Sequence, residues 1–177
     1  MMENRNKEEL LMLLKQLIEI PSITGSDAVG QAIQFVRTWL EKEGIQTKVI
    51  ISHGVPNLIA KVGDSGKVLL WNSHVDVVPS GDYEHWNHPP FIATEENGYI
   101  CGRGTSDAKS GLAAMMYALK LLREKQLSGQ ICLMVSGAEE TGSENGTVAM
   151  LNACDQIFDA AIVAEPSDMN IDRKSVV

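Results

Sequence analysis

Apolar residues recur at helical spacing along several stretches of the chain. Leucines three and four positions apart predict a helix over residues 7–19, which Pro21 ends because proline disfavours helical geometry in the residue before it. A second stripe followed by Gly44 predicts a helix from residue 29 onward, with one apolar face: Val29, Ile33, Val36 and Leu40. Further helices are predicted over residues 110–125 and 145–152.

Short apolar or β-branched runs between these helices are typical of strands. They are bounded by Gly, Pro, Asn or Asp, and they predict strands at residues 47–52, 58–62, 68–72, 130–136 and 159–164. The last two runs are almost entirely apolar, so we expect both strands to be buried. Because strands alternate with helices, the pattern predicts an α/β fold. The expected sheet is mixed and mostly parallel, with helices on both faces.

Two turn regions complete the predicted architecture. Asp64-Ser65-Gly66 lies between two predicted strands and is expected to close a hairpin. Residues 75–106 are mostly loop, with a short strand pair expected around 91–94 and 99–101. A loop of this length inside a compact domain is usually functional.

Length and composition narrow the class of protein. The 177 residues fit a single domain, 1–177, and the net charge of −8 argues against a nucleic-acid partner, which would need clustered Lys and Arg. Residues 1–9 are polar and lack the apolar segment of a signal peptide. Apolar runs fall short of the roughly 20 residues that span a membrane. We therefore expect a cytoplasmic protein with no membrane partner.

The cysteines give no sign of a metal site or a disulfide framework. Cys101, Cys132 and Cys154 are odd in number, and no two have the CxxC spacing of a thiolate zinc site. We expect them to act as small apolar residues in a reducing compartment.

Candidate chemistry gathers where predicted strands end. A histidine and four carboxylates follow strands or precede a helix: His74, Asp107, Glu139, Glu140 and Glu165. In open α/β sheets, ligands bind beyond the carboxyl ends of the strands. Nitrogen and oxygen donors of this kind suit zinc, and less selectively manganese or cobalt. Converging carboxylates are costly to bury unpaired, and a divalent cation removes that cost.

Each residue also has an ordinary structural interpretation when it is taken singly. His74-Val75-Asp76 can be a loop histidine with a hydrogen-bonded neighbour, and Asp107 can cap the helix that follows it. A Glu-Glu pair is commonly a solvated turn, and Glu165 before proline is commonly a surface residue. The order in which these residues occur along the chain favours the metal-site interpretation.

That order resembles the zinc-dependent M20 metallopeptidases, a family of deacylases, desuccinylases and peptidases. The resemblance extends from about Lys7 to Asp168 and is carried by an ordered set of motifs: Ser73-His74-Val75-Asp76-Val77-Val78-Pro79, Trp86 with Pro90-Phe91, Gly98 to Gly111, Glu139-Glu140-Thr141-Gly142-Ser143, and Glu165-Pro166. It implies two zinc ions, for which cobalt or manganese can substitute. His74 and Glu165 would bind one ion, Glu140 the other, and Asp107 would bridge both.

The same resemblance implies the catalytic roles. Glu139 would be the general base that takes a proton from water and later gives it to the leaving amine. Asp76 would accept a hydrogen bond from His74 and fix its tautomer. A cis peptide is implied between Asp107 and Ala108. The expected reaction is hydrolysis of an amide bond in a small N-acyl amino acid or short peptide-like substrate.

Members of the family carry a further histidine ligand and an inserted lid and dimerisation domain. The histidines of this chain are His53, His74, His85 and His88, and none lies at the place of that further ligand. The chain is therefore expected to be a partial catalytic domain, weakly active or inactive alone, with a homodimer in a full-length form. Two alternatives stay open: a metal-binding or interaction module without turnover, and a related co-catalytic zinc aminopeptidase.

Overall fold

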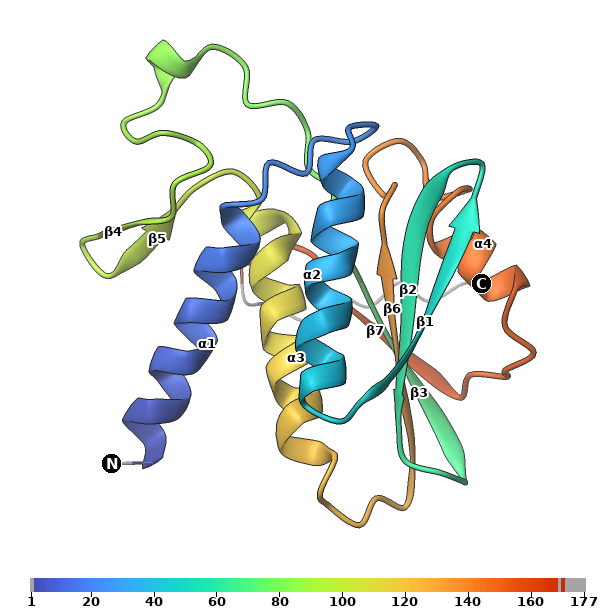
Figure 1. Ribbon diagram of the computed structural model, residues 1–177. Helices are drawn as coiled ribbons and strands as arrows, with labels where there is room; N and C mark the ends of the chain where they lie inside the picture. The colour runs from blue at the N-terminus through green and yellow to red at the C-terminus, as the bar shows by residue number, and fades with distance from the viewer. Residues whose placement is uncertain (1, 169, 171–177) are drawn as a thin grey trace.

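The computed structural model describes residues 2–168 and 170, and Figure 1 shows a sheet with helices packed against it. The helices are α1 (Met2–Ile18), α2 (Ala28–Lys42), α3 (Ser110–Leu122) and α4 (Thr147–Asn152), with short helical turns at Tyr83–His85 and Thr105–Lys109. The strands are β1 (Gln46–Ser52), β2 (Val55–Val62), β3 (Lys67–His74), β4 (Thr94–Glu96), β5 (Tyr99–Cys101), β6 (Gly129–Ser136) and β7 (Ala160–Val163).

Within the described residues, the main sheet has the strand order β1-β2-β6-β3-β7. Strands β1, β2 and β6 pair antiparallel, whereas β3 pairs parallel with both β6 and β7. The predicted α/β class with a mixed sheet is confirmed. The parallel part of the sheet is the part that matters for function, because β3, β6 and β7 all end at the same edge.

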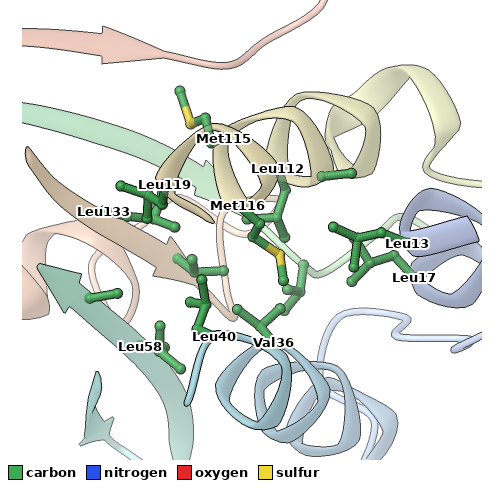
Figure 2. Close-up of a cluster of buried hydrophobic side chains, with 14 of the residues drawn as sticks. Leu13, Leu17, Val36, Leu40, Leu58, Leu112, Met115, Met116, Leu119 and Leu133 are labelled. Carbon is green, nitrogen blue, oxygen red and sulfur yellow. The ribbon is translucent and has the colours of Figure 1, made fainter. Parts of the chain in front are cut away.

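Helices cover both faces of the sheet, as expected. On one face, α1, α2 and α3 contribute apolar residues to a core that includes Leu58 and Leu133 of the sheet (Figure 2). The stripe on α2 is buried as the sequence predicts, and Gly44 after this helix has the positive φ of 76° that ends many helices. On the opposite face, Met150 of α4 packs with Ile59 and Met134.

The predicted hairpin at Asp64-Ser65-Gly66 is wrong. These residues do connect β2 to β3, but the two strands are not paired, because β6 lies between them. A Cβ atom added to Gly66 would lie 2.6 Å from the carbonyl oxygen of Ser128, in the segment that leads into β6. The turn therefore passes over the start of an intervening strand, and a local turn signal carries no information about that strand.

Two further strand predictions need correction. The first strand of the small pair begins at Thr94 rather than Phe91, because the backbone N–H of Ile92 bonds the carbonyl of Pro89 in a turn. Strand β7 forms where expected but is exposed along its whole length, with Ile162 and Val163 50% and 56% exposed. It is the last strand at its edge of the sheet, and an apolar run does not reveal that position. No helix within the described part of the chain is long and apolar enough to cross a membrane.

Candidate metal centre

The parallel strands bring distant residues to one edge of the sheet. His74 is the last residue of β3 and is paired in register with Ser136, the last residue of β6. Glu139 and Glu140 follow β6 within four residues, and Glu165 comes two residues after β7 ends. Asp107 reaches the same place from the turn that precedes α3. The convergence expected at the carboxyl ends of the strands is therefore present.

His74 lies at the centre of this cluster and is fully buried. Its Nε2 atom is 3.0 Å from Asp107 Oδ1, 3.7 Å from Glu165 Oε1 and 4.0 Å from Glu139 Oε2. One ligand atom each from His74, Asp107 and Glu165 lies within 4.8 Å of the others. Two nitrogen or oxygen ligands on a tetrahedral zinc stand about 3.3 Å apart. These separations fit a divalent cation with small side-chain adjustments.

The tautomer of His74 follows from its other ring nitrogen. Nδ1 lies 2.9 Å from the backbone carbonyl oxygen of Asp76 and 3.4 Å from its carboxylate. A carbonyl oxygen can only accept, so Nδ1 carries the proton, and in the neutral ring Nε2 presents its lone pair to the carboxylates. The backbone carbonyl of Asp76 is thus the nearer partner of Nδ1, and its carboxylate, whose role the resemblance implies, is the more distant one.

The carboxylate of Asp76 also connects separate segments of the chain by hydrogen bonds. It is buried and accepts hydrogen bonds from the backbone N–H groups of Glu139 at 3.0 Å and Glu140 at 3.2 Å, and from the hydroxyl of Thr24 at 2.9 Å. Burial acts to raise the pKa of Asp76, but the bonds from His74, Glu139 and Thr24 outweigh it and lower the pKa. Asp76 therefore joins the end of β3 to the loop that carries both glutamates.

The remaining carboxylates repel one another. Burial raises the pKa of Glu165 to about 7; the charge of His74 opposes this shift, whereas the charges of Asp107 and Glu139 add to it. Burial and the charge of Asp107 likewise raise the pKa of Glu140. Burial lowers the pKa of His74, but the bond and charge of Asp76 and the charge of Glu165 together raise it to about 9. A cation placed among these oxygens would relieve the repulsion.

Asp107 does not act as a helix cap. Its backbone is extended, with φ −122° and ψ 100°, and its carboxylate faces His74 rather than the first N–H groups of α3. The peptide bond between Asp107 and Ala108 is cis, as the resemblance implies. Glu140 lies outside the group formed by His74, Asp107 and Glu165, although the charge of Asp107 reaches it.

Two supporting residues carried no signal in the sequence. Thr24 bonds Asp76 only because Ile23 and Val77 form an isolated bridge that brings the segment after α1 beside the end of β3. Lys109 is fully buried, and its ammonium donates to the carbonyls of Leu17 at 2.9 Å and Ile20 at 2.8 Å. A lysine near a helix start is ordinarily exposed, so neither role could be read from residue type.

Comparison with known proteins identifies the family of the chain. The sequence model of peptidase family M20/M25/M40 matches residues 70–176. The chain is 42% identical over 164 residues to succinyl-diaminopimelate desuccinylase of Coxiella burnetii, and the match covers 90% of this chain. The chain spans 43% of the length of that relative.

Solved structures show the same fold. The M20 family metallo-carboxypeptidase Sso-CP2 from Sulfolobus solfataricus superposes with a TM-score of 0.79 and 30% sequence identity, over 88% of this chain and 37% of that one. Aminopeptidase PepT from Bacillus cereus superposes with a TM-score of 0.60 and 25% identity, over 78% of this chain and 38% of that one. By the match of its sequence to the family model and to these relatives, the chain belongs to peptidase family M20/M25/M40.

Proposed function

We propose that this chain is part of a metal-dependent hydrolase, which cleaves the amide bond of a small N-acyl amino acid or short peptide-like substrate. One observation carries the proposal: ligand atoms of His74, Asp107 and Glu165 lie within 4.8 Å of one another. The desuccinylase relative supports a succinylated amino acid as the first substrate to test. The partner of the site is then a small molecule.

The donor set supports zinc, with cobalt and manganese as substitutes. One imidazole and several carboxylates match the ligands of catalytic zinc sites. His74 and Glu165 would hold one ion, Glu140 a second, and Asp107 would contact both. The raised pKa values of Glu140 and Glu165 support this assignment, because both carboxylates gain from a nearby positive charge.

The proposed chemistry assigns a separate task to each side chain. When bound, the ions supply Lewis acidity and lower the pKa of water towards about 7. Glu139 takes a proton from the attacking water and returns it to the leaving amine, so that no charge accumulates on nitrogen. The backbone carbonyl of Asp76 accepts from Nδ1 of His74 and so orients Nε2 towards the carboxylates. Residues 1–177 are proposed to act as one unit of a metallopeptidase catalytic domain.

Substitution of the proposed base tests this function. Glu139→Gln keeps the size of the side chain and removes its basicity, so hydrolysis of an N-succinyl amino acid should fall by about 10²–10⁴-fold while bound metal is retained. Glu144→Gln, in the same loop, is the matched control and should leave the rate unchanged. Hydrolysis that survives Glu139→Gln would refute the assigned base. The assays should include succinyl-diaminopimelate desuccinylase of Coxiella burnetii as a positive control, because this chain spans 43% of the length of that relative.

The aminopeptidase alternative has one observation in its favour, the likeness to PepT at 25% identity. An aminopeptidase needs a free amino terminus on its substrate, whereas a deacylase needs that nitrogen acylated. Parallel assays with a dipeptide and with its N-succinyl form therefore separate the two. If this chain binds metal but hydrolyses neither substrate under conditions in which the longer relative is active, a non-catalytic metal-binding module would be favoured.

A further inference from the structure

A second group of metal-ligand atoms lies apart from the candidate metal centre. His88, Glu96 and Cys101 each place one ligand atom within 4.8 Å of the other two. His88 Nε2 lies 3.2 Å from Glu96 Oε2. We propose that these three residues, the hairpin site, bind a single zinc ion. The proposal does not depend on the proposed function, since it uses none of the residues of the other centre.

The register of the β4–β5 hairpin places two of the ligands together. Glu96 pairs with Tyr99 and Thr94 pairs with Cys101, so Glu96 and Cys101 are diagonal neighbours on one face of the hairpin. Successive side chains of a strand point to opposite faces. Glu95 accordingly points the other way and forms an ion pair with Lys15 of α1. The face that carries Glu96 and Cys101 is therefore turned away from α1 and is open to a third ligand.

His88 supplies that ligand from a loop that is held in place. The backbone N–H of Arg103, two residues after Cys101, bonds the carbonyl of Pro90 at 2.6 Å. The guanidinium of Arg103 lies 5.0 Å from the centre of the Trp86 ring, and the indole N–H of Trp86 bonds the carbonyl of Ser80 at 2.9 Å. These contacts on both sides of His88 fix the loop against the hairpin before any ion binds.

The ligand chemistry selects zinc. A thiolate, an imidazole and a carboxylate are the three protein ligand types that zinc accepts, whereas magnesium and calcium prefer oxygen alone. The 3.2 Å between His88 Nε2 and Glu96 Oε2 matches the roughly 3.3 Å expected between two ligands on tetrahedral zinc. The His88 side chain is 28% exposed and that of Glu96 is 51% exposed, so an ion and a water as fourth ligand can reach the site.

Cobalt titration distinguishes this site from the other centre. A thiolate bound to Co²⁺ gives an intense near-ultraviolet charge-transfer absorption, which nitrogen and oxygen ligands do not give. The donors gathered at the candidate metal centre are nitrogen and oxygen only. The whole chain should therefore develop this band, with an amplitude at saturation that corresponds to one thiolate-bound cobalt per chain, whatever further cobalt the other centre binds. Cys101→Ser should abolish the band, and Cys154→Ser, a matched cysteine away from the hairpin, should keep it.

Two further variants complete the test. His88→Gln changes a partly exposed loop residue and should weaken cobalt binding, read from the same band, by more than the roughly 10–100-fold typical of losing an outer-shell partner. Glu95→Gln, on the other face of the hairpin, should leave the affinity unchanged. A wild-type protein without the band, or a band that persists in folded Cys101→Ser, overturns the proposal. In that case His88 and Glu96 form only a hydrogen-bonded pair.

Discussion

The carboxylate of Asp76 accepts a hydrogen bond from the backbone N–H of Glu139 at 3.0 Å, across 63 positions of sequence. This bond ties the segment after β3 to the loop after β6, and each segment carries part of the candidate metal centre. The same carboxylate also lies 3.4 Å from Nδ1 of His74. A change at Asp76 should therefore disturb both His74, a proposed ligand, and Glu139, the proposed base.

Asp76→Asn tests this coupling. The backbone N–H groups of Glu139 and Glu140 each bond one carboxylate oxygen of Asp76, and in asparagine an NH2 donor replaces one of these oxygens. We therefore expect a loss of about 1–3 kcal/mol in the free energy of unfolding. Zinc affinity should fall by about 10–100-fold, as when the outer partner of a metal-binding histidine is lost. Denaturant unfolding and zinc titration measure the two effects. Asp82→Asn, at an exposed position, is the control.

An unchanged zinc affinity in Asp76→Asn would contradict this coupling. It would mean that the backbone carbonyl of Asp76, which lies 2.9 Å from Nδ1 and survives the substitution, orients His74 by itself. The effect on stability and the effect on affinity would then separate.

Gly111→Ala should weaken metal binding from a distance. A Cβ atom at Gly111 would lie 2.6 Å from the Cβ of Ala164, whose backbone N–H is held by the carbonyl of Asn72. The added methyl group would push Ala164 and with it the neighbouring Glu165, a proposed ligand. We expect zinc affinity to fall about tenfold, with a loss of about 1–3 kcal/mol from overpacking. Calorimetric titration and thermal unfolding measure these outcomes.

The matched control is Gly30→Ala, since a Cβ atom at Gly30 in α2 would meet nothing within 4 Å. This change should raise the free energy of unfolding by about 0.5–1 kcal/mol, because alanine favours the helix, and it should leave zinc affinity unchanged. Equal zinc affinities in the two alanine variants would show that Ala164 yields without moving Glu165.

The location of much of the candidate site could be predicted from the sequence, because parallel strands end at the same edge of a sheet. Residues after β3, β6 and β7 had to meet at one edge once the α/β pattern was read, and His74 and Glu165 do meet there. The stripe on α2 was equally readable, because helical spacing is a local property. The sequence does not by itself assign the chemical roles of these residues, which rest on the resemblance.

Other features could not be read because they depend on non-local pairing. The turn at residues 64–66 looks like a hairpin turn, yet the pairing partner of both adjoining strands is β6, more than 60 residues further on. Strand β7 is as apolar as a buried strand but lies at the sheet edge. The spacing of His88 and Cys101 along the chain is not one typical of metal sites. The β4–β5 register places Cys101 beside Glu96, and the loop before the hairpin brings His88 to the same place.

Metal-free protein should lose stability as pH rises from 4.5 to about 7, the ordinary and the raised pKa of Glu165. Over this interval the folded carboxyl holds a proton that the unfolded chain has released, so rising pH favours unfolding. The raised pKa of Glu140 acts in the same direction. Thermal unfolding in the presence of a chelator measures the slope, which should be smaller in Glu165→Gln.

Added zinc should reverse that slope, because metal ligands must be deprotonated to bind. Above neutral pH the shifts oppose each other. Loss of the proton from His74, with its pKa raised to about 9, favours unfolding as pH rises, whereas burial lowers the pKa of Lys109 to about 7 and acts the other way. A metal-free protein whose stability rises between pH 4.5 and about 7 would contradict the repulsion around Glu165.

Lys109→Met should destabilise the end of α1 and should also lower metal affinity by displacing Asp107. Methionine keeps most of the buried volume but removes the ammonium that donates to the carbonyls of Leu17 and Ile20. Both carbonyls keep a backbone N–H donor, from Ile20 and Ser22 respectively, but the loss of two hydrogen bonds from a charged donor should cost about 1–3 kcal/mol in the free energy of unfolding. Because Asp107 is two residues away, zinc affinity should fall as well. Denaturant unfolding and zinc titration measure both, with exposed Lys125→Met as the control. If stability falls while zinc affinity stays unchanged, Lys109 supports α1 alone, and Asp107 is held by the turn itself.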